Sequence, residues 1–533
     1  MRMNRRKSSG LNAKPPAFKH IVGGLFFLLA FALPVHAQEV GSYSELQAAA
    51  LAGSGEGTIK LTKDILDGKT ELVIGRNITL DLNGHSLTID LPVATGKTSN
   101  GIKINSGVTL TIVDSNLGAS NALTVRNNAS ASTTDGHGAG INSTDGTLEI
   151  KSGRVNAFGG YLGAGIGGGA NKASGRIMID GGTVTAEGGE AGAGIGSVYQ
   201  SIGSNITIYK GTVTARGGTG AAGIGGGIST AGGFIYIYGG AINATGGRMG
   251  AGIGGGWESS GGYIYISGAG TIDATGGNAT GQAGAGAGIG GGGGGLTNSS
   301  GASGSIRIIG IVKVTAKGGT SELQGGGAGI GSGGSGSNGQ VGAAGNAENP
   351  IIIENSVDFL QGGPTGGTGA NGRNGASIGM GGGLNSAGAA WKFHNLTVTH
   401  NTGGSVYPGT SRVSEGSKVF FSVFIHSGFV LREVTVDGIP ETLTDSSQFN
   451  FNIPAMTAPK TVTVTFDDNE NGGNGGTGGG GGGGSHPPPP TTPSTSSSSS
   501  GGCSTSGGPF GLIALVTFAA FGWVRRKSPL QGI

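Results

Sequence analysis

Six aromatic residues recur at alternate positions in three short segments, and residues of this type can bind sugars. They are Tyr209, Phe234, Tyr236, Tyr238, Tyr263 and Tyr265. In a strand, alternation puts such side chains on one face, where flat rings offer contact area and hydroxyl groups. Arg176, Arg307 and Asp180 are expected at the rim. The pattern predicts a carbohydrate-binding face. Two alternatives stay open, a stabilising ladder of rings and an apolar surface covered by an inserted loop.

Catalytic side chains do not cluster in the sequence. Polysaccharide lyases and hydrolases need carboxylates close together, whereas the acids of the regular segments occupy scattered positions: Asp180, Glu187, Glu190, Glu258 and Asp273. The segment 135–138, Asp-Gly-His-Gly, is interpreted mainly as a turn. Glycine-rich segments such as 163–169 are not followed by the helix that a dinucleotide-binding loop requires. No spacing of Cys and His residues is typical of a metal site. We expect no catalytic residue, cofactor or metal, although a carbohydrate-active enzyme remains the alternative hypothesis.

A repeat must position the aromatic residues. Gly-Ala-Gly-Ile or a close variant recurs, and its isoleucines are Ile141, Ile166, Ile195, Ile224, Ile253, Ile289, Ile330 and Ile378. Three successive spacings are 29 residues, and the later ones grow by insertion. A fixed period with insertions is typical of stacked coils.

Each repeat also contains two pairs of apolar residues at positions i and i+2, which is the spacing of one strand face. The first pairs begin at Ile177, Ile206, Ile235, Ile264 and Ile306, and the second at Val184, Val213, Ile242, Ile272 and Val314. With the Gly-Ala-Gly-Ile step, every coil then has three inward-facing apolar steps separated by glycine corners. This predicts an all-β, three-sided solenoid of glycine-rich 29-residue coils over residues 60–395.

The segment before the coils predicts a cap over residues 38–59, in which 44–52 form a short helix. Leu80-Asp81-Leu82-Asn83-Gly84-His85 and the alternating stretch 102–112 follow it. With the repeat, these segments resemble right-handed parallel β-helices of the pectate-lyase-like class. The resemblance covers about residues 40–395 and bears on fold rather than on reaction.

A different pattern occupies residues 396–468. Its flanking strands 397–399 and 462–466 alternate in polarity, and Asp437-Gly438 predicts a tight turn between strands, so a small β domain is expected. The order of the motifs resembles the divergent internalin B-repeat domain of bacterial surface proteins. That resemblance implies a stalk or an adhesive spacer.

Both ends of the chain resemble targeting segments. Residues 1–37 have a basic start, an apolar run and small residues before Gln38, which predicts a signal peptide cleaved between Ala37 and Gln38. Residues 469–502 are a Gly/Pro/Ser-rich linker. In residues 503–533, Cys503 precedes a short apolar run and a basic cluster. This tail resembles the Synergist-type sorting signals of diderm bacteria, and the resemblance implies a surface location and sorting machinery that processes the tail near Cys503. The alternative is a plain membrane anchor in which Cys503 is inert or forms a dimer.

The amino-acid composition excludes two classes of protein. Of 533 residues 122 are Gly, whereas only 17 are Pro, so a strict collagen repeat is excluded. Charged residues make up 11% and the net charge is +3, which argues against a nucleic-acid partner. We therefore expect an exported structural or adhesive protein of the cell surface that binds a surface or extracellular glycan. The sequence indicates neither the identity of that glycan nor a state of self-association.

Overall fold

The computed structural model describes residues 37–468 apart from short segments at 53–55, 94–98, 117–120, 129–137, 170–171, 173, 202, 297–298, 338, 344–349, 355–356, 360–363, 384–385, 391 and 443–448. The expected signal peptide up to residue 36, the turn residues 135–137, the linker 469–502 and the tail with Cys503 lie outside the described residues. Within the described ranges, no helix is both long and apolar enough to cross a membrane.

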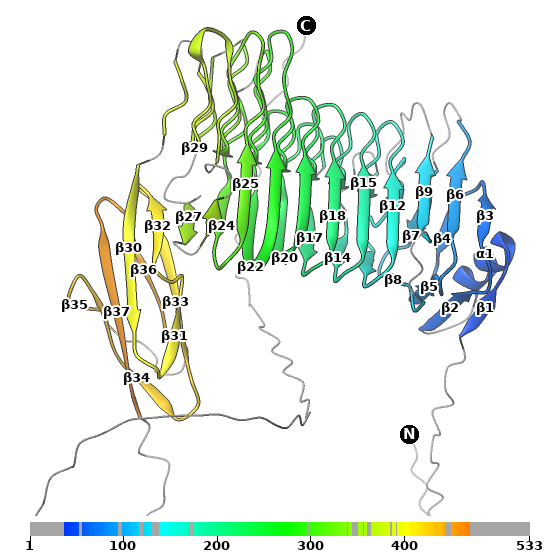
Figure 1. The fold of residues 1–533 in the computed structure, drawn as a ribbon, viewed down its shortest axis with the longest axis horizontal. Coiled ribbons are helices and arrows are strands. Elements are labelled where there is room, and N and C mark those ends of the chain that lie inside the picture. The colour runs from blue at the N-terminus through cyan, green and yellow to red at the C-terminus, as the bar shows by residue number, and fades with distance from the viewer. Residues whose placement is uncertain are drawn as a thin grey trace, which may run out of the picture. The chain divides into compact units, whose positions relative to one another are not determined.

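The chain forms an all-β parallel β-helix, as the repeat predicts (Figure 1). Its first ladder joins β1 (Gln38–Val40), β2 (Gly57–Leu61), β5 (Ile78–Asp81), β8 (Thr109–Val113), β11 (Thr147–Ile150), β14 (Arg176–Ile179), β17 (Ser204–Ile208), β20 (Gly233–Thr245), β22 (Tyr263–Thr275), β24 (Ser305–Ile308) and β27 (Ile351–Glu354). Parallel pairing begins at β1, so the segment predicted as a cap contributes strands to the β-helix.

Two further ladders complete the coils. The second ladder joins β3 (Ile65–Gly68), β6 (Leu87–Leu91), β9 (Leu123–Asn127), β12 (Arg154–Phe158), β15 (Thr183–Glu187), β18 (Thr212–Arg216), the later halves of β20 and β22, β25 (Lys313–Lys317) and β28 (Asp358–Phe359). The third ladder joins β4 (Leu72–Ile74), β7 (Ile102–Ile104), β10 (Ile141–Asn142), β13 (Ile166–Gly167), β16 (Ile195–Gly196), β19 (Ile224–Gly225), β21 (Ile253–Gly254), β23 (Ile289–Gly290), β26 (Ile330–Gly331) and β29 (Ile378–Gly379). A short 3-10 helix, η2 (Ala370–Gly372), lies before β29.

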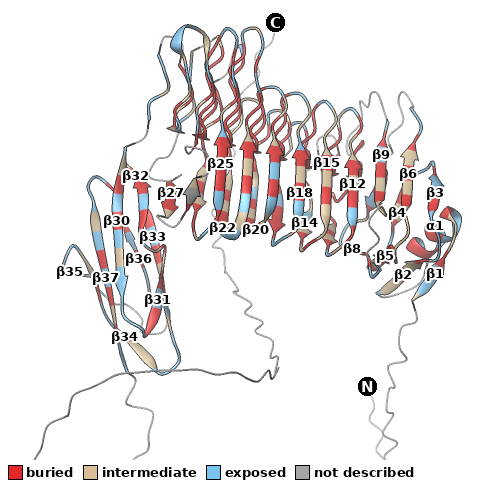
Figure 2. Cartoon of the chain, in the orientation of Figure 1, coloured by how far each residue is buried: buried red, intermediate tan, exposed pale blue. Residues whose placement is uncertain are grey.

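The predicted strand alignments are confirmed residue by residue. Ile177 pairs with Ile206 in the first ladder, and Val184 pairs with Val213 in the second. These side chains are fully buried in one apolar core that runs through the coils. Figure 2 shows the resulting alternation of buried and exposed residues along the strands. Because strand side chains alternate between faces, burial of the aliphatic residues sends their neighbours outward.

Glycine at the third ladder allows the coils to stack closely. Gly196 and Gly225 occupy the same position in successive coils, with φ angles of 139° and 130°. A Cβ atom on Gly225 would collide with the backbone carbonyl of Gly254 in the next coil. The high glycine content therefore reflects both left-handed backbone and the absence of room for a side chain.

The N-terminal end of the core is covered by the predicted helix, α1 (Tyr43–Leu51). Ser42 and Glu45 form a capping box, in which each side chain bonds to the other residue's backbone N–H. A hydrogen bond from the backbone N–H of Gly41 lowers the pKa of Glu45. The helix buries Leu46 and Ala49 against the first strands, so its apolar side seals this end.

The small β domain comprises residues 393–468, and its core also includes Ile352 of β27. Its strands are β30 (Phe393–His400), β31 (Gly404–Tyr407), β32 (Ser411–Ser414), β33 (Val419–Ile425), β34 (Phe429–Val436), β35 (Ile439–Pro440), β36 (Phe449–Ile453) and β37 (Lys460–Asp468). The predicted turn is confirmed, because Asp437 and Gly438 have φ angles of 50° and 79° and connect β34 to β35. Strand β32 pairs antiparallel with β27, the last strand of the first ladder.

Candidate functional site

The six predicted aromatic residues lie together on the outer side of the first ladder, and we call this surface the aromatic face. Tyr209 follows β17, and the others lie on β20 and β22. Phe234 pairs with Tyr263 and Tyr236 with Tyr265 in the parallel register of β20 and β22. Since the buried isoleucines Ile235 and Ile264 alternate with them, the pleat of the strands determines this outward position.

The rings of the aromatic face contact one another across the coils. Their centroids lie 5.3–6.4 Å apart. Tyr209 and Tyr238 are stacked at 5.3 Å with an interplanar angle of 14°, whereas Tyr236 and Tyr265 are tilted by 49° at 6.2 Å. These separations are within the range of favourable aromatic pairs. The rings therefore form one continuous surface rather than six separate contacts.

The hydroxyl groups of this surface are partly withdrawn from water. Burial raises the pKa of Tyr236, Tyr238 and Tyr263 above the usual tyrosine range, and Arg307 opposes the shift at Tyr263. These phenols are neutral at physiological pH, as tyrosines with the ordinary pKa also are. Each hydroxyl can then both donate and accept a hydrogen bond, which matches the hydroxyl groups of sugars.

Two of the three predicted rim residues, Arg307 and Arg176, differ in their distance from the rings. Arg307 pairs in register with Tyr265, so it adjoins the aromatic face directly. Arg176 pairs with Asn205, and Asn205 in turn pairs with Phe234, so one coil separates Arg176 from the rings. The structure thus brings Arg307 into the site, whereas Arg176 lies farther along the same sheet.

One further ring, Tyr407 of β31, was missed by the sequence analysis. It lies 6.3 Å from Tyr265, and the Arg307 guanidinium lies 5.2 Å from the centre of its ring. Burial raises the pKa of Tyr407 strongly. No local signal in the sequence could have identified this contact, because it depends on the pairing of β27 with β32.

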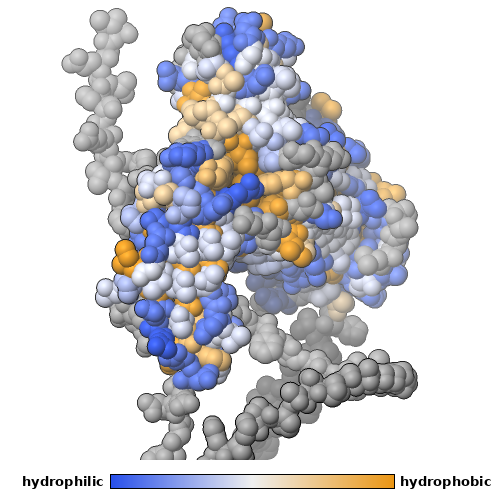
Figure 3. All heavy atoms as spheres, turned by 60° about the vertical axis from the view of Figure 1, so that its left-hand side comes forward, coloured by the Kyte–Doolittle hydropathy of each residue, from blue (hydrophilic) through white to orange (hydrophobic). Residues whose placement is uncertain are grey.

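A cavity of about 850 Å³ adjoins the aromatic face. Phe234, Tyr263, Asn205 and Phe420 of β33 are among its lining residues, and Arg307 is the only charged one of the described residues that line it. Phe420 is 58% exposed. Figure 3 shows that hydrophobic residues also gather in patches on the side of the protein that it turns forward. The cavity has the size of a small-molecule site.

The carboxylates on the same sheet differ in their partners. Glu149 accepts a hydrogen bond from Thr111 at 3.2 Å and forms an ion pair with Lys151 at 3.3 Å. Asp180 follows β14 in the coil before Tyr209. In the part of the chain that the structure describes, no group of three His, Cys, Asp or Glu side chains could hold a metal ion. Glu149 thus has both a hydrogen-bond donor and a basic partner on the sheet.

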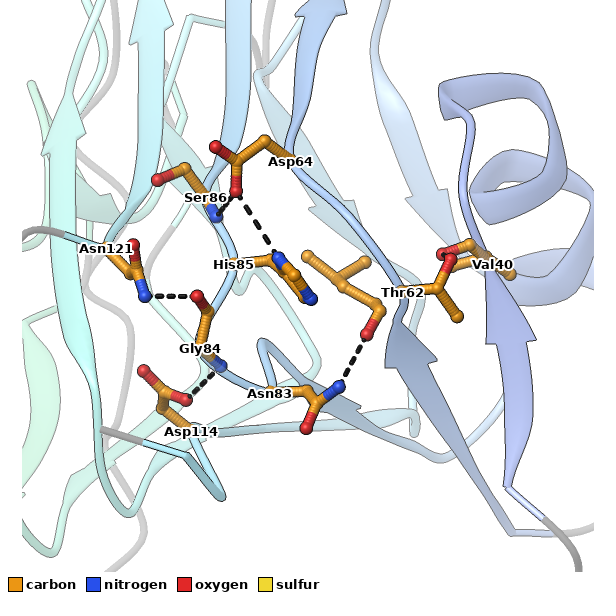
Figure 4. Close-up of polar contacts among 10 residues, drawn as sticks. Val40, Thr62, Asp64, Asn83, Gly84, His85, Ser86, Asp114 and Asn121 are labelled. Atoms are coloured by element: carbon orange, nitrogen blue, oxygen red, sulfur yellow. Dashed lines mark hydrogen bonds and ion pairs between the residues drawn. The ribbon is translucent and has the colours of Figure 1, made fainter. Parts of the chain in front are cut away.

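A polar cluster at the corner after β5 has a structural role (Figure 4). Asn83 donates to the carbonyl of Leu61 at 2.9 Å, and the Gly84 N–H donates to Asp114 at 2.7 Å. His85 lies 3.5 Å from the Asp64 carboxylate, which also accepts the Ser86 N–H. Asp114 and Asp64 thus each accept a hydrogen bond from the backbone of a neighbouring coil. These hydrogen bonds connect the corners of successive coils.

The predicted processing site lies at the first described strand. Ala37 precedes β1, and Gln38 begins it and pairs with Ile59. Cleavage between Ala37 and Gln38 would leave every described strand intact.

Comparison with known proteins supports the fold. A family model described as the beta helix repeat matches residues 148–170, 177–197, 206–228 and 235–257. These segments include Tyr209 and two of the three aromatic residues of β20, Tyr236 and Tyr238. No curated protein and no solved structure matches the chain. The matching repeat describes the scaffold and carries no ligand or reaction with it.

Proposed function

We propose that the protein is a secreted, structural or adhesive protein of the cell surface that binds glycan through the aromatic face. The observation that carries this proposal is the contact of six outward rings on adjacent strands. Contiguous exposed aromatic residues often mark a binding surface. Sugar rings have apolar C–H faces and a hydroxyl periphery, and they suit flat rings bordered by an arginine.

The aromatic face offers this contact at low entropic cost. Tyr236 and Tyr265 are held by their neighbours, so binding orders few additional side-chain bonds. Arg307 adds charged donors beside Tyr265. A bound chain would contact several rings at once, and each buried aromatic contact contributes about 1 kcal/mol or more to affinity.

The cell-surface location rests on the two ends of the chain. The signal-like residues 1–37 and the tail that begins at Cys503 support export followed by sorting in a diderm bacterium. In this proposal the sorting machinery processes the tail near Cys503. The small β domain serves as a spacer, which is the role that its resemblance to internalin B-repeats implies. The protein would then present the β-helix outside the cell.

A glycan array probed with the full chain tests the binding proposal. The double variant Tyr236→Ala/Tyr265→Ala should bind at least about tenfold more weakly, with an unchanged far-ultraviolet circular dichroism spectrum. Tyr236→Phe/Tyr265→Phe should keep most of the binding, because the rings remain. Thr185→Ala/Thr214→Ala is the matched control, since these residues also face outward on neighbouring coils but on the second ladder. If the tyrosine double variant loses thermal stability and keeps all binding, the face is a stabilising ladder only.

A further inference from the structure

A second cavity, of about 560 Å³, lies at a different corner of the β-helix. We call it the corner pocket. Residues 219–220, 248–249 and 280–283 follow strands of the second ladder and form one wall, and residues 228, 257 and 295–296 follow strands of the third ladder and form the other. The pocket includes no residue of the aromatic face. It therefore cannot be explained by the site already described.

The floor of the corner pocket is apolar and contains a tryptophan. Trp257 packs against a small core cluster of Met249, Ala279, Ala283 and Ala285. Met249 has a φ angle of 68°, at a position where the preceding coil has Gly220 with a φ of 77°. A methionine in left-handed backbone carries a conformational cost, and here its side chain helps to build the wall beside Trp257.

The rim of the corner pocket is polar and charged. Arg248 donates a hydrogen bond to the carbonyl of Thr280 at 2.7 Å, which holds this part of the rim in place. Glu190 lies on the rim two coils earlier and is exposed. Among the described residues, Glu190 has no hydrogen-bond or ion-pair partner and Arg248 has no acidic one. The rim thus combines a group that only accepts hydrogen bonds with one that only donates them.

We propose that the corner pocket is a second carbohydrate site, in which one sugar ring lies against the Trp257 indole. The apolar C–H face of a pyranose suits the indole and Met249. Its hydroxyl groups both donate and accept, so they can bond to Glu190 and Arg248 together. A purely apolar ligand would offer no hydrogen-bond partner to Glu190 or Arg248. An anionic ligand would be repelled by the Glu190 carboxylate. The cavity volume is within the range of small-molecule sites.

Tryptophan fluorescence of the full chain tests this site directly, because the sequence contains only three tryptophans. In the variant Trp391→Phe/Trp523→Phe, Trp257 is the sole reporter. The probes are hexasaccharides of glucose, N-acetylglucosamine, mannose, xylose and galactose, all of them uncharged. We expect at least one probe to change the emission saturably. The double variant Glu190→Gln/Arg248→Gln in the same background should weaken that response about tenfold or more, because two charged hydrogen-bonding groups are lost.

The aromatic face provides the control that separates the two sites. Tyr236→Ala/Tyr265→Ala in the Trp257-only background should leave the fluorescence response unchanged. The corner-pocket proposal is overturned if none of the five probes changes the emission, if the rim variant responds like its parent, or if the tyrosine variant abolishes the response. Thermal melting and far-ultraviolet circular dichroism of every variant establish that the fold is retained. The glycan array reports on the aromatic face independently.

Discussion

Tyr236 and Tyr265 face the same side of adjacent coils, with ring centroids 6.2 Å apart and ring planes tilted by 49°. Their backbone positions pair directly in the parallel register of β20 and β22. The contact is therefore a property of the folded coils, present without any ligand. It follows that replacing either residue changes stability as well as any binding.

A double-mutant cycle separates these two effects. Tyr236→Ala, Tyr265→Ala and the double variant should give a coupling free energy of about 0.5–1.5 kcal/mol in urea unfolding, which is typical of aromatic pairs. The same cycle for Tyr236 and Tyr209 serves as the comparison, because the ring of Tyr209 contacts that of Tyr238. A coupling of zero between Tyr236 and Tyr265 would contradict direct ring contact.

Replacing Ile237 with Asp should unfold the central coils. Ile237 is fully buried between Ile208 and Ile266 of the adjacent coils, so the carboxylate would enter a core with no polar partner. The expected loss is about 4 kcal/mol or more in the free energy of unfolding. Thr214→Asp introduces the same side chain at an outward position and should cost less than about 0.5 kcal/mol. Equal effects of the two substitutions in thermal melting would refute the inward assignment.

Two glycine substitutions distinguish backbone strain from steric collision. Gly225→Ala places a Cβ atom against the carbonyl of Gly254, whereas Gly107, with a φ angle of 72°, has nothing within 4 Å of its Cβ position. Gly107→Ala should cost about 1–2 kcal/mol from strain alone. Gly225→Ala should cost clearly more, as measured by chemical unfolding. A similar cost for both would mean that close stacking does not require glycine at the third ladder.

Alkaline pH should destabilise the protein through the aromatic face. Burial raises the pKa of Tyr236, Tyr238 and Tyr263, so the unfolded chain loses these protons first. Their contribution is complete below about pH 10, the ordinary tyrosine pKa, and is lost as the pH rises through the folded-state values. Melting temperatures between about pH 8 and pH 12 should therefore fall less steeply when all three are changed to Phe. Parallel curves would show that these phenols do not cause the dependence.

Mass spectrometry of protein extracted from the cell surface tests the processing proposal. The mature chain should begin at Gln38, which is the first residue of β1, and it should be cleaved or modified near Cys503. Detection of an unmodified chain that extends to Ile533 would contradict sorting at the tail. A chain that begins at Met1 would contradict the signal peptide.

The coils were predictable because their information is local and repeated. Ile235 and Ile237 show the inward face of one strand, and the same pair recurs 29 residues later as Ile264 and Ile266, so the register of both strands follows from the sequence. The outward position of Tyr236 follows from the same alternation. In these repeated strands, the alternation that buries the isoleucines also determines which residues pair between coils.

Tyr407 and the corner pocket could not be predicted in this way. Tyr407 reaches Tyr265 only because β32 pairs with β27, and this antiparallel contact between segments far apart in sequence has no periodic signature. Trp257 lies in a glycine-rich corner where side chains do not alternate. Its contact with Met249 and Ala283 depends on the path of separate corner segments, and the length of those segments varies from coil to coil.

The pairing of β32 with β27 also covers the C-terminal edge of the first ladder. A parallel β-helix without such a partner ends in a strand with unpaired N–H and C=O groups, and an edge of this kind can recruit another chain. Here the outer edge of β27 is occupied by an antiparallel strand of the same polypeptide, through Ile352 and Val413. Growth by addition of further molecules is blocked along this strand. A chain truncated before β30 would expose the edge of β27 and is expected to associate through it.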